Sequence, residues 1–397
     1  MNQKTNIVYP DYNNCIINLI STIMNVYGVK SEYPPLKQIN IDKLEKKKNI
    51  ILIIFDGLGY ELLKSYSSNA GSFMHDHLLD HITSVFPPTT TAAITSLMTC
   101  KSPLEHGALG WTLYFKEYSK YIDILPGIDD ITGKLLKMKQ YKIMQIMRIN
   151  NFFNIIHKEN PNISLDKIMP EYLINGDYSR QISYPANVIP YSSIENLFKA
   201  VSDRILNDSN EKKLIIAYST NPDGLEHKNG TDSIEVANFI YKIDEYIKEL
   251  CNNLRNTDTT LLITADHGLI NVNKYYYTNE ITELYDCMIM PTFPEPRFLT
   301  FHLKKHKISK FEKIIDKYRD KFLVLNRKEF IESGLLGRGK QHKKIDDFIG
   351  DYVAISISDS AMKTIFQQKG KEKNEFKAHH SGLTREEMLV PIIEIDI

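Results

Sequence analysis

Apolar residues along this chain follow two periodicities. From Asn49 to Phe55 the run Ile-Ile-Leu-Ile-Ile-Phe contains no polar residue, which is typical of a central parallel strand covered on both faces. Shorter runs predict three further strands, at 82–86, 214–218 and 260–264. Apolar residues recur at spacings of three and four over 13–27 and 236–250, which predicts two amphipathic helices. This alternation predicts an α/β fold with a mostly parallel central sheet and helices on both faces.

Two stretches fit the alternation poorly, and we expect them to be insertions. Residues 113–200 have weak periodicity and are interpreted as a substrate cap. Residues 276–350 contain a strand-like segment at 297–303 and a Lys-rich helix at 310–318, which indicates a smaller α+β unit. The catalytic core would then comprise 1–112, 201–275 and 351–397, with closing strands at 352–357 and 388–395.

Composition narrows the class of protein. The 49 Lys and Arg residues cancel the 49 Asp and Glu residues, so no overall basic field favours a nucleic-acid duplex or a membrane surface as partner. The four cysteines are scattered, without the spacing of a disulfide framework or a thiolate zinc site. Neither a signal-peptide pattern nor a run of about 20 apolar residues is present, so we expect a cytoplasmic protein.

Carboxylates and imidazoles follow three of the predicted strands. Asp56 comes directly after the first, Asp223 and His227 follow the strand at 214–218, and Asp266 and His267 follow the strand at 260–264. Each alone could be a turn or helix-capping residue. Because parallel strands gather their carboxyl ends at one edge of a sheet, the set together predicts a metal site. Carboxylate and imidazole donors without thiolate suit zinc or manganese.

Three threonines, Thr89 to Thr91, precede a helix predicted at 92–98. One interpretation is a helix cap. The other is a nucleophile, because a hydroxyl at a helix N-terminus that touches a metal is favoured as an alkoxide. The nearby Gly57-Leu58-Gly59 does not predict dinucleotide binding, because Leu62 stands where the third glycine of that motif belongs.

Taken in order, the segments Phe86-Pro-Pro-Thr-Thr90, Asp223-Gly-Leu-Glu-His227, Thr264-Ala-Asp266-His267-Gly and His380-Ser-Gly-Leu form a recognisable series. The series resembles the type I phosphodiesterase/nucleotide pyrophosphatase family of the alkaline phosphatase superfamily. The resemblance implies the alkaline-phosphatase-like fold and two divalent metal ions, usually Zn²⁺, with Mn²⁺ as the alternative.

Carried over residue by residue, the resemblance assigns one ion to Asp56, Thr90, Asp266 and His267, and the other to Asp223, His227 and His380. His380 is preferred to His379 because it stands three residues before Leu383. Thr90 would attack phosphorus and form a phosphothreonine. The substrate would be a small phosphodiester or pyrophosphate of nucleotide type.

One position departs from the family. Trp111 stands where nucleotide pyrophosphatases carry an asparagine that contacts the phosphate. Its indole could donate one hydrogen bond or stack on a nucleotide base, which would make it a substrate-binding residue; alternatively, the Trp-Thr-Leu-Tyr-Phe run could be a core strand. The remaining alternatives are a phosphomonoesterase or phosphomutase of the same superfamily, and a catalytically inactive binding protein on this scaffold.

Overall fold

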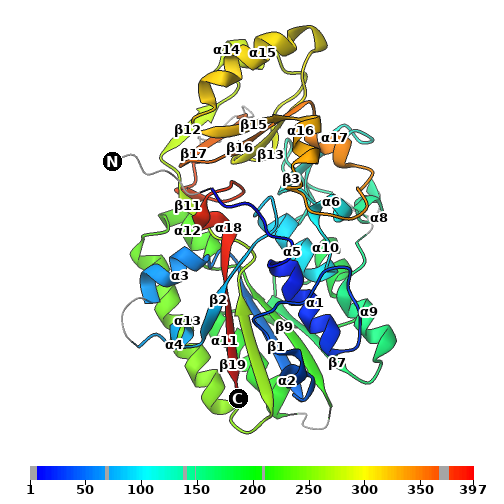
Figure 1. The fold of residues 1–397 in the computed structure, drawn as a ribbon, viewed down its shortest axis with the longest axis vertical. Coiled ribbons are helices and arrows are strands. Elements are labelled where there is room, and N and C mark those ends of the chain that lie inside the picture. Colours follow the sequence, from blue (N-terminus) through cyan, green and yellow to red (C-terminus); the bar gives the residue numbers. More distant parts are fainter. Residues whose placement is uncertain (1–6, 68–70, 137–140, 148, 208–210, 366–374) are drawn as a thin grey trace.

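The largest element is a seven-stranded sheet with the order β2-β19-β10-β1-β9-β7-β8 (Figure 1). The computed structural model describes residues 7–67, 71–136, 141–147, 149–207, 211–365 and 375–397. Five neighbouring strands are parallel: β10 (Thr259–Thr264), β1 (Asn49–Phe55), β9 (Lys213–Ser219), β7 (Ser164–Pro170) and β8 (Asn187–Tyr191). β19 (Leu389–Asp396) pairs antiparallel with β10 and with the edge strand β2 (Leu78–Thr83). The predicted mostly parallel sheet is confirmed.

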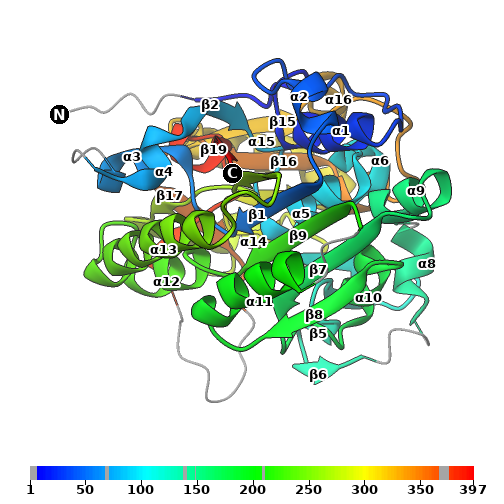
Figure 2. The same cartoon turned by 90° about the horizontal axis from the view of Figure 1, so that it is seen from below.

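Helices cover both faces of this sheet (Figure 2). α1 (Ile16–Val26), α2 (Ile41–Glu45) and α5 (Thr90–Thr99) lie on one side, and α11 (Ile194–Leu206) and α13 (Ile234–Asn253) lie on the other. Every residue of β1 is buried, as expected for an apolar strand between two helical layers. The predicted helices at 13–27, 92–98 and 236–250 are confirmed as α1, α5 and α13.

The predicted strand at 82–86 has the wrong bounds. β2 begins at Leu78 and ends at Thr83, so only its last two residues were included. Its first four residues are half-buried or exposed because β2 is a sheet edge. An edge strand can contain polar residues such as Asp80 and His81, and a search for apolar runs does not identify this part of the strand.

Residues 113–200 do not lie wholly outside the sheet, because β7 and β8 come from this segment. Two charged residues, Asp166 and Lys167, interrupt the apolar pattern of β7. Both are buried, and Asp166 Oδ2 accepts a hydrogen bond of 2.9 Å from Arg204 Nε. Another part of the segment forms an antiparallel meander: β3 (Thr112–Phe115), β4 (Lys120–Asp123), β5 (Ile128–Asp129) and β6 (Lys134–Leu135). The division into a core and two insertions otherwise stays a prediction.

A second, four-stranded sheet lies above the central sheet in Figure 1. Its order is β13 (Phe293–Glu295), β14 (Phe298–Phe301), β16 (Tyr352–Ser356) and β15 (Phe322–Asn326), all antiparallel. It has its own apolar cluster, which includes Phe311 of α15 (Ile308–Ile315). The strand predicted at 352–357 exists as β16 but belongs to this second sheet, whereas we expected it in the core.

The orientation of the strands places the carboxyl ends of β1, β9 and β10 toward the second sheet. β19 ends at the C-terminus near the bottom of Figure 1, and β10 runs antiparallel to it. β1 and β9 are parallel to β10. The edge of the central sheet that carries the predicted metal ligands therefore faces the second sheet.

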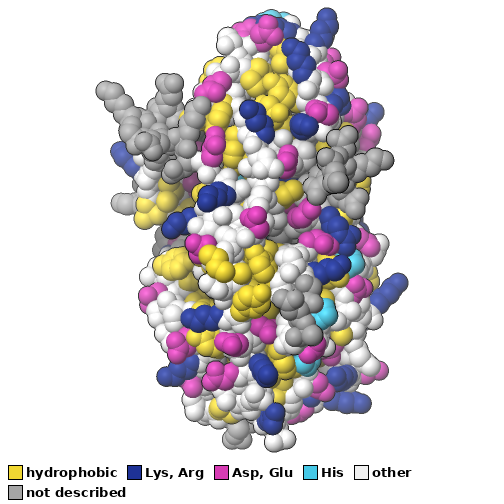
Figure 3. All heavy atoms as spheres, turned by 90° about the vertical axis from the view of Figure 1, so that its left-hand side faces the viewer, with side chains coloured by type: hydrophobic (Ala, Val, Ile, Leu, Met, Phe, Trp, Pro, Cys, Tyr) yellow, Lys and Arg dark blue, Asp and Glu magenta, His cyan; other side chains and the backbone are white. Residues whose placement is uncertain are grey.

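Basic and acidic side chains are interspersed over the face drawn in Figure 3. Within the described ranges, no helix combines the length and the apolar character that crossing a bilayer requires.

Candidate active site

Thr90 is the first residue of α5, and Thr89 is its N-cap in an extended conformation. The Thr90 Oγ1 atom lies 3.2 Å from His267 Nε2 and 3.5 Å from each carboxylate oxygen of Asp56. The Thr91 hydroxyl is buried and has no hydrogen-bond partner among the described residues. Of the three threonines, Thr90 is the one that meets the predicted ligands.

The first cluster of ligand atoms comes from Asp56, Asp266 and His267. His267 Nε2 lies 3.4 Å from Asp56 Oδ1 and 3.6 Å from Asp266 Oδ2. His267 Nδ1 lies 3.2 Å from the carbonyl oxygen of Gly268, which leaves Nε2 toward the carboxylates. Asp266 Oδ2 is buried and accepts no hydrogen bond in the described part of the chain. A buried carboxylate oxygen without a donor is costly, and a bound cation would offset that cost.

The second cluster comes from Asp223, at the start of α12 (Asp223–Asn229), together with His227 and His380. Asp223 Oδ1 lies 3.2 Å from His227 Nε2 and 3.9 Å from His380 Nε2. His227 Nδ1 lies 2.8 Å from the carbonyl oxygen of Ala378, and His380 Nδ1 lies 3.0 Å from Ser381 Oγ. Metal-binding histidines commonly have the second ring nitrogen anchored in this way.

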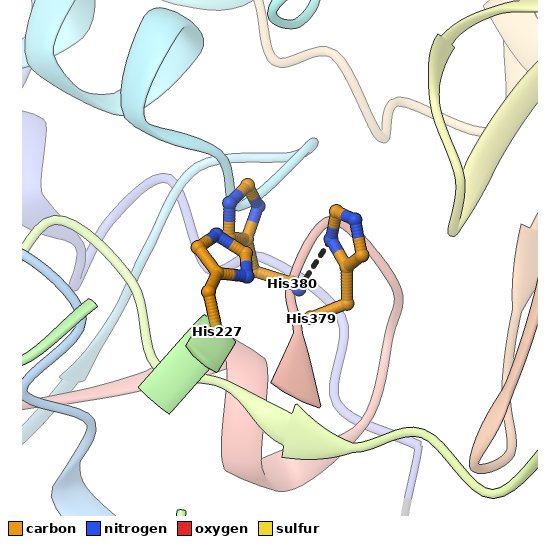
Figure 4. Close-up of side chains that lie close together, drawn as sticks. All are labelled: His227, His379 and His380. Atoms are coloured by element: carbon orange, nitrogen blue, oxygen red, sulfur yellow. Dashed lines mark hydrogen bonds between the residues drawn. The ribbon is translucent and has the colours of Figure 1, made fainter. Parts of the chain in front are cut away.

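His379 also belongs to this neighbourhood, as Figure 4 shows. It follows Ala378 in β18 (Ala378–His379), and its Nδ1 accepts a 3.2 Å hydrogen bond from the backbone N–H of His380. Its ring centroid lies 5.0 Å from that of His227. His227, His379 and His380 form a further group whose ligand atoms lie within 4.8 Å of one another. The preference for His380 over His379 stays a prediction.

Repulsion among the carboxylates shifts their ionisation. Burial, followed by the charges of Asp266 and Asp223, raises the pKa of Asp56 well above its usual value. Burial and Asp223 raise the pKa of Asp266 to about 7. Burial lowers the pKa of His227, but the charge of Asp223, the hydrogen bonds of the ring to Asp223 and to the Ala378 backbone, and the charge of Asp56 together raise that pKa to about 9. Asp56 and Asp266 therefore bind protons more readily than isolated carboxylates do, and bound cations would relieve the same repulsion between the carboxylates.

Close backbone approaches explain the glycines around the site. Gly57 has φ +82°, and a Cβ there would lie 2.8 Å from the backbone of Asp223. A Cβ on Gly268 would lie 2.1 Å from the carbonyl oxygen of Glu386. Gly57 and Gly268 therefore let segments that carry ligands pack against other backbone.

Several supporting residues were not identified from the sequence. The Tyr218 hydroxyl, at the end of β9, donates a hydrogen bond to Asp56 Oδ2. The buried ion pair Arg297–Glu387 holds the loop that follows His380, because Gly382 N donates to Glu387 Oε1 at 2.7 Å. Tyr218 interrupts an apolar run, a weak signal that could have identified it.

A cavity of about 470 Å³ opens over the site. Thr90, Asp223, His227 and His380 line it, with Trp111 and Glu295 from outside the central sheet. Trp111 is 41% exposed, so its side chain is not part of the core. The seven predicted ligand positions are brought together, and four of them line the cavity together with Trp111.

The fold and site define an alkaline-phosphatase-like α/β protein with a buried cluster of carboxylates and imidazoles. The chain belongs to the type I phosphodiesterase / nucleotide pyrophosphatase family, whose model matches residues 50–382. This membership indicates a phosphoester hydrolase. Among curated proteins, no sequence matches this chain.

Solved structures share the fold at low identity. Murine ectonucleotide pyrophosphatase / phosphodiesterase 5, in an inactive form in complex with AMP, has a TM-score of 0.62 and 15% identity, covering 86% of this chain and 87% of that one. Its human counterpart has the same score and identity, covering 88% and 87%. Phosphonoacetate hydrolase from Sinorhizobium meliloti, in complex with phosphonoformate, has a TM-score of 0.62 and 16% identity, covering 87% and 89%.

Proposed function

We propose that this chain is a two-metal hydrolase that cleaves phosphodiester or pyrophosphate bonds in small substrates of nucleotide type. The observation that carries the proposal is a pair of buried carboxylate oxygens, Asp223 Oδ1 and Asp266 Oδ2, that face other potential metal ligands. Both face histidine Nε2 atoms at 3.2 to 3.6 Å. Such convergence of acceptor atoms fits divalent cations.

In this proposal, Asp56, Thr90, Asp266 and His267 hold one ion, and Asp223, His227 and His380 hold the other. Oxygen and nitrogen donors without thiolate favour Zn²⁺, with Mn²⁺ as the alternative. When bound, two such ions stabilise the charge on the entering and leaving oxygens of a phosphoryl group.

The chain itself supplies the nucleophile. Thr90 Oγ1 stands at the N-terminus of α5, where the helix dipole favours negative charge on oxygen. Its attack forms a bond to phosphorus and breaks the bond to the leaving group, which departs with its electron pair and takes up a proton. Water then cleaves the phosphothreonine and regenerates the hydroxyl.

The nucleotide part of the proposal is supported by Trp111, whose exposed ring lines the cavity. It is also supported by the AMP complex of the murine structural relative. A cytoplasmic location stays part of the proposal, supported by four buried cysteines that are free thiols.

Metal analysis combined with a substrate pair tests this function. We expect close to two divalent metals per chain, and loss of one in Asp223→Ala or His227→Ala. The loaded enzyme should hydrolyse bis(4-nitrophenyl) phosphate faster than 4-nitrophenyl phosphate. Faster monoester hydrolysis would favour the phosphomonoesterase alternative, and active protein without any transition metal would exclude the two-metal mechanism.

A further inference from the structure

Glu295, the last residue of β13, links three parts of the chain at the wall of the active-site cavity. The residue is 6% exposed. Its Oε1 atom accepts two hydrogen bonds, at 2.7 Å from Thr89 Oγ1 and at 2.6 Å from the backbone N–H of Trp111. Thr89 directly precedes the proposed nucleophile Thr90, and Trp111 lines the same cavity. One oxygen atom of the second sheet therefore contacts both the segment of the nucleophile and the segment of Trp111.

The hydroxyl of Thr89 serves this contact and not the helix that it precedes. Thr89 is the N-cap residue of α5, where a threonine commonly accepts a hydrogen bond from an N–H of the first helical turn. Its side chain forms no such capping bond, and its hydroxyl donates to Glu295. Because the first N–H groups of a helix have no partner within it, hydrogen bonds inside α5 hold Thr90 only through its carbonyl group. The contact with Glu295 adds a side-chain restraint directly before Thr90.

The turn that carries Glu295 is itself restrained. Arg297, two residues further on, is fully buried. Its guanidinium pairs with Glu387 Oε1 at 2.7 Å and donates to two backbone carbonyl oxygens, each at 2.8 Å. A Cβ on Gly110 would lie 2.8 Å from Pro294 Cβ, so this glycine lets the segment that follows α6 (Pro103–His106) pack directly against β13. A carboxylate on such a turn can fix the groups that it binds.

We propose that Glu295 is a positioning residue for the reaction, and that its Oε1 atom holds the nucleophile Thr90 and the substrate-binding Trp111 in a fixed relative position. The inference rests on the proposed function for the role of Thr90, and it adds a residue that acts through Thr89 and through the Trp111 backbone. What this role requires is an acceptor oxygen at this place, and not a negative charge. A substitution that keeps the oxygen should therefore keep turnover, and one that removes it should not.

The turnover assay uses the 4-nitrophenyl ester of a nucleoside monophosphate. Thr89→Val removes the hydroxyl and keeps the shape of the side chain, and it should lower kcat by about 10- to 100-fold with little change in KM, as expected for a small misplacement of the nucleophile. Glu295→Met should lower kcat as much and also raise KM, because Trp111 is released as well. Glu295→Gln should keep kcat within a few-fold of the wild type, because its amide oxygen still accepts from both donors.

Thr300→Val is the matched control for the loss of a buried hydroxyl. Thr300 is buried in β14 of the same sheet, and its hydroxyl donates to the carbonyl oxygen of Phe293 at 2.9 Å, so the variant removes one hydrogen bond without touching α5. Its kcat and KM should match those of the wild type. A kcat in Thr89→Val as high as in Thr300→Val, or a kcat in Glu295→Gln as low as in Glu295→Met, would overturn the inference.

Hydrogen exchange tests the contact with Trp111 without any turnover. Trp111 is the single tryptophan, so isotope labelling of tryptophan alone gives one backbone amide resonance. This amide should be protected in the wild type, in Thr89→Val and in Glu295→Gln, and should exchange at least about tenfold faster in Glu295→Met, where its acceptor is lost. Equal protection in Glu295→Met and the wild type would overturn the inference. The expected exchange pattern in a protein that hydrolyses no phosphodiester would support the contact of Glu295 and count against the proposed function alone.

Discussion

Replacing Tyr218 by phenylalanine tests whether the Asp56 cluster holds a metal ion. The Tyr218 hydroxyl donates to Asp56 Oδ2, and both groups are buried. Burial, followed by the charges of Asp56 and Asp266, raises the pKa of this phenol, so it stays a donor at any working pH. Phenylalanine keeps the ring and removes this hydrogen bond.

The expected size of the effect follows from that one hydrogen bond. A hydrogen bond to a charged group contributes about 1.5–3 kcal/mol, which corresponds to a loss of about 10- to 150-fold in affinity for the ion that Asp56 binds. The Asp223 cluster should keep its affinity, because the Tyr218 hydroxyl has no hydrogen bond to Asp223, His227 or His380. Titration with chelator-buffered zinc should therefore show one weakened site and one unchanged site.

Tyr191→Phe is the control for this experiment. The Tyr191 hydroxyl donates to the backbone carbonyl of Tyr218 at 3.0 Å, so the variant removes a hydrogen bond nearby without touching a ligand. Both zinc affinities should match those of the wild type. If Tyr218→Phe left both affinities unchanged, or if the two variants behaved alike, the assignment of Asp56 to a metal ion would be refuted.

Three further predictions concern the nucleophile, the substrate and the backbone. Thr90→Ala should keep the wild-type melting temperature and lose several orders of magnitude in kcat, as expected when a covalent step is abolished. Thr91→Ala should lose far less activity. An inactive Thr91→Ala variant together with an active Thr90→Ala variant would contradict the assignment of Thr90 as the nucleophile. Trp111→Ala should lower kcat/KM for a nucleotide substrate by the equivalent of roughly 1 to 3 kcal/mol, and should lower it much less for a diester that lacks any aromatic group. Equal losses with the two substrates would show that Trp111 does not stack on a nucleotide base. Gly268→Ala should lower the melting temperature measurably, because the added Cβ would lie 2.1 Å from the Glu386 carbonyl oxygen and overpacking costs about 1–3 kcal/mol. An unchanged melting temperature would show that the backbone segments at Gly268 and Glu386 can move apart.

The sequence predicted the strands whose apolar runs are unbroken. β1 and β10 are buried throughout and lie beside each other in the sheet. β7 was missed because its pattern contains Asp166 and Lys167, whose burial depends on partners far along the chain. β16 was predicted as a strand, but its membership of the second sheet depends on pairing with β14, which no local pattern encodes.

The candidate ligands could be predicted because most of them follow strands in short motifs. Supporting residues lack such signals. Glu295 meets Thr89 across 206 residues of sequence, and its segment had no recognisable motif. Tyr218 and Arg297 likewise act through contacts between distant parts of the sequence. Tyr218 reaches Asp56 from the neighbouring strand of the central sheet, and Arg297, between β13 and β14, pairs with Glu387 just before β19. Sequence patterns therefore indicated the chemistry of the site, and the fold was needed to show what positions it.

The stereochemical course at phosphorus tests the central claim most directly. A phosphodiester made chiral at phosphorus by sulfur substitution would be hydrolysed in heavy-oxygen water, and the configuration of the product determined. Attack by Thr90 followed by attack of water gives two in-line displacements, so we expect net retention of configuration. Net inversion would mean that water attacks the substrate directly, and it would contradict a phosphothreonine intermediate on Thr90.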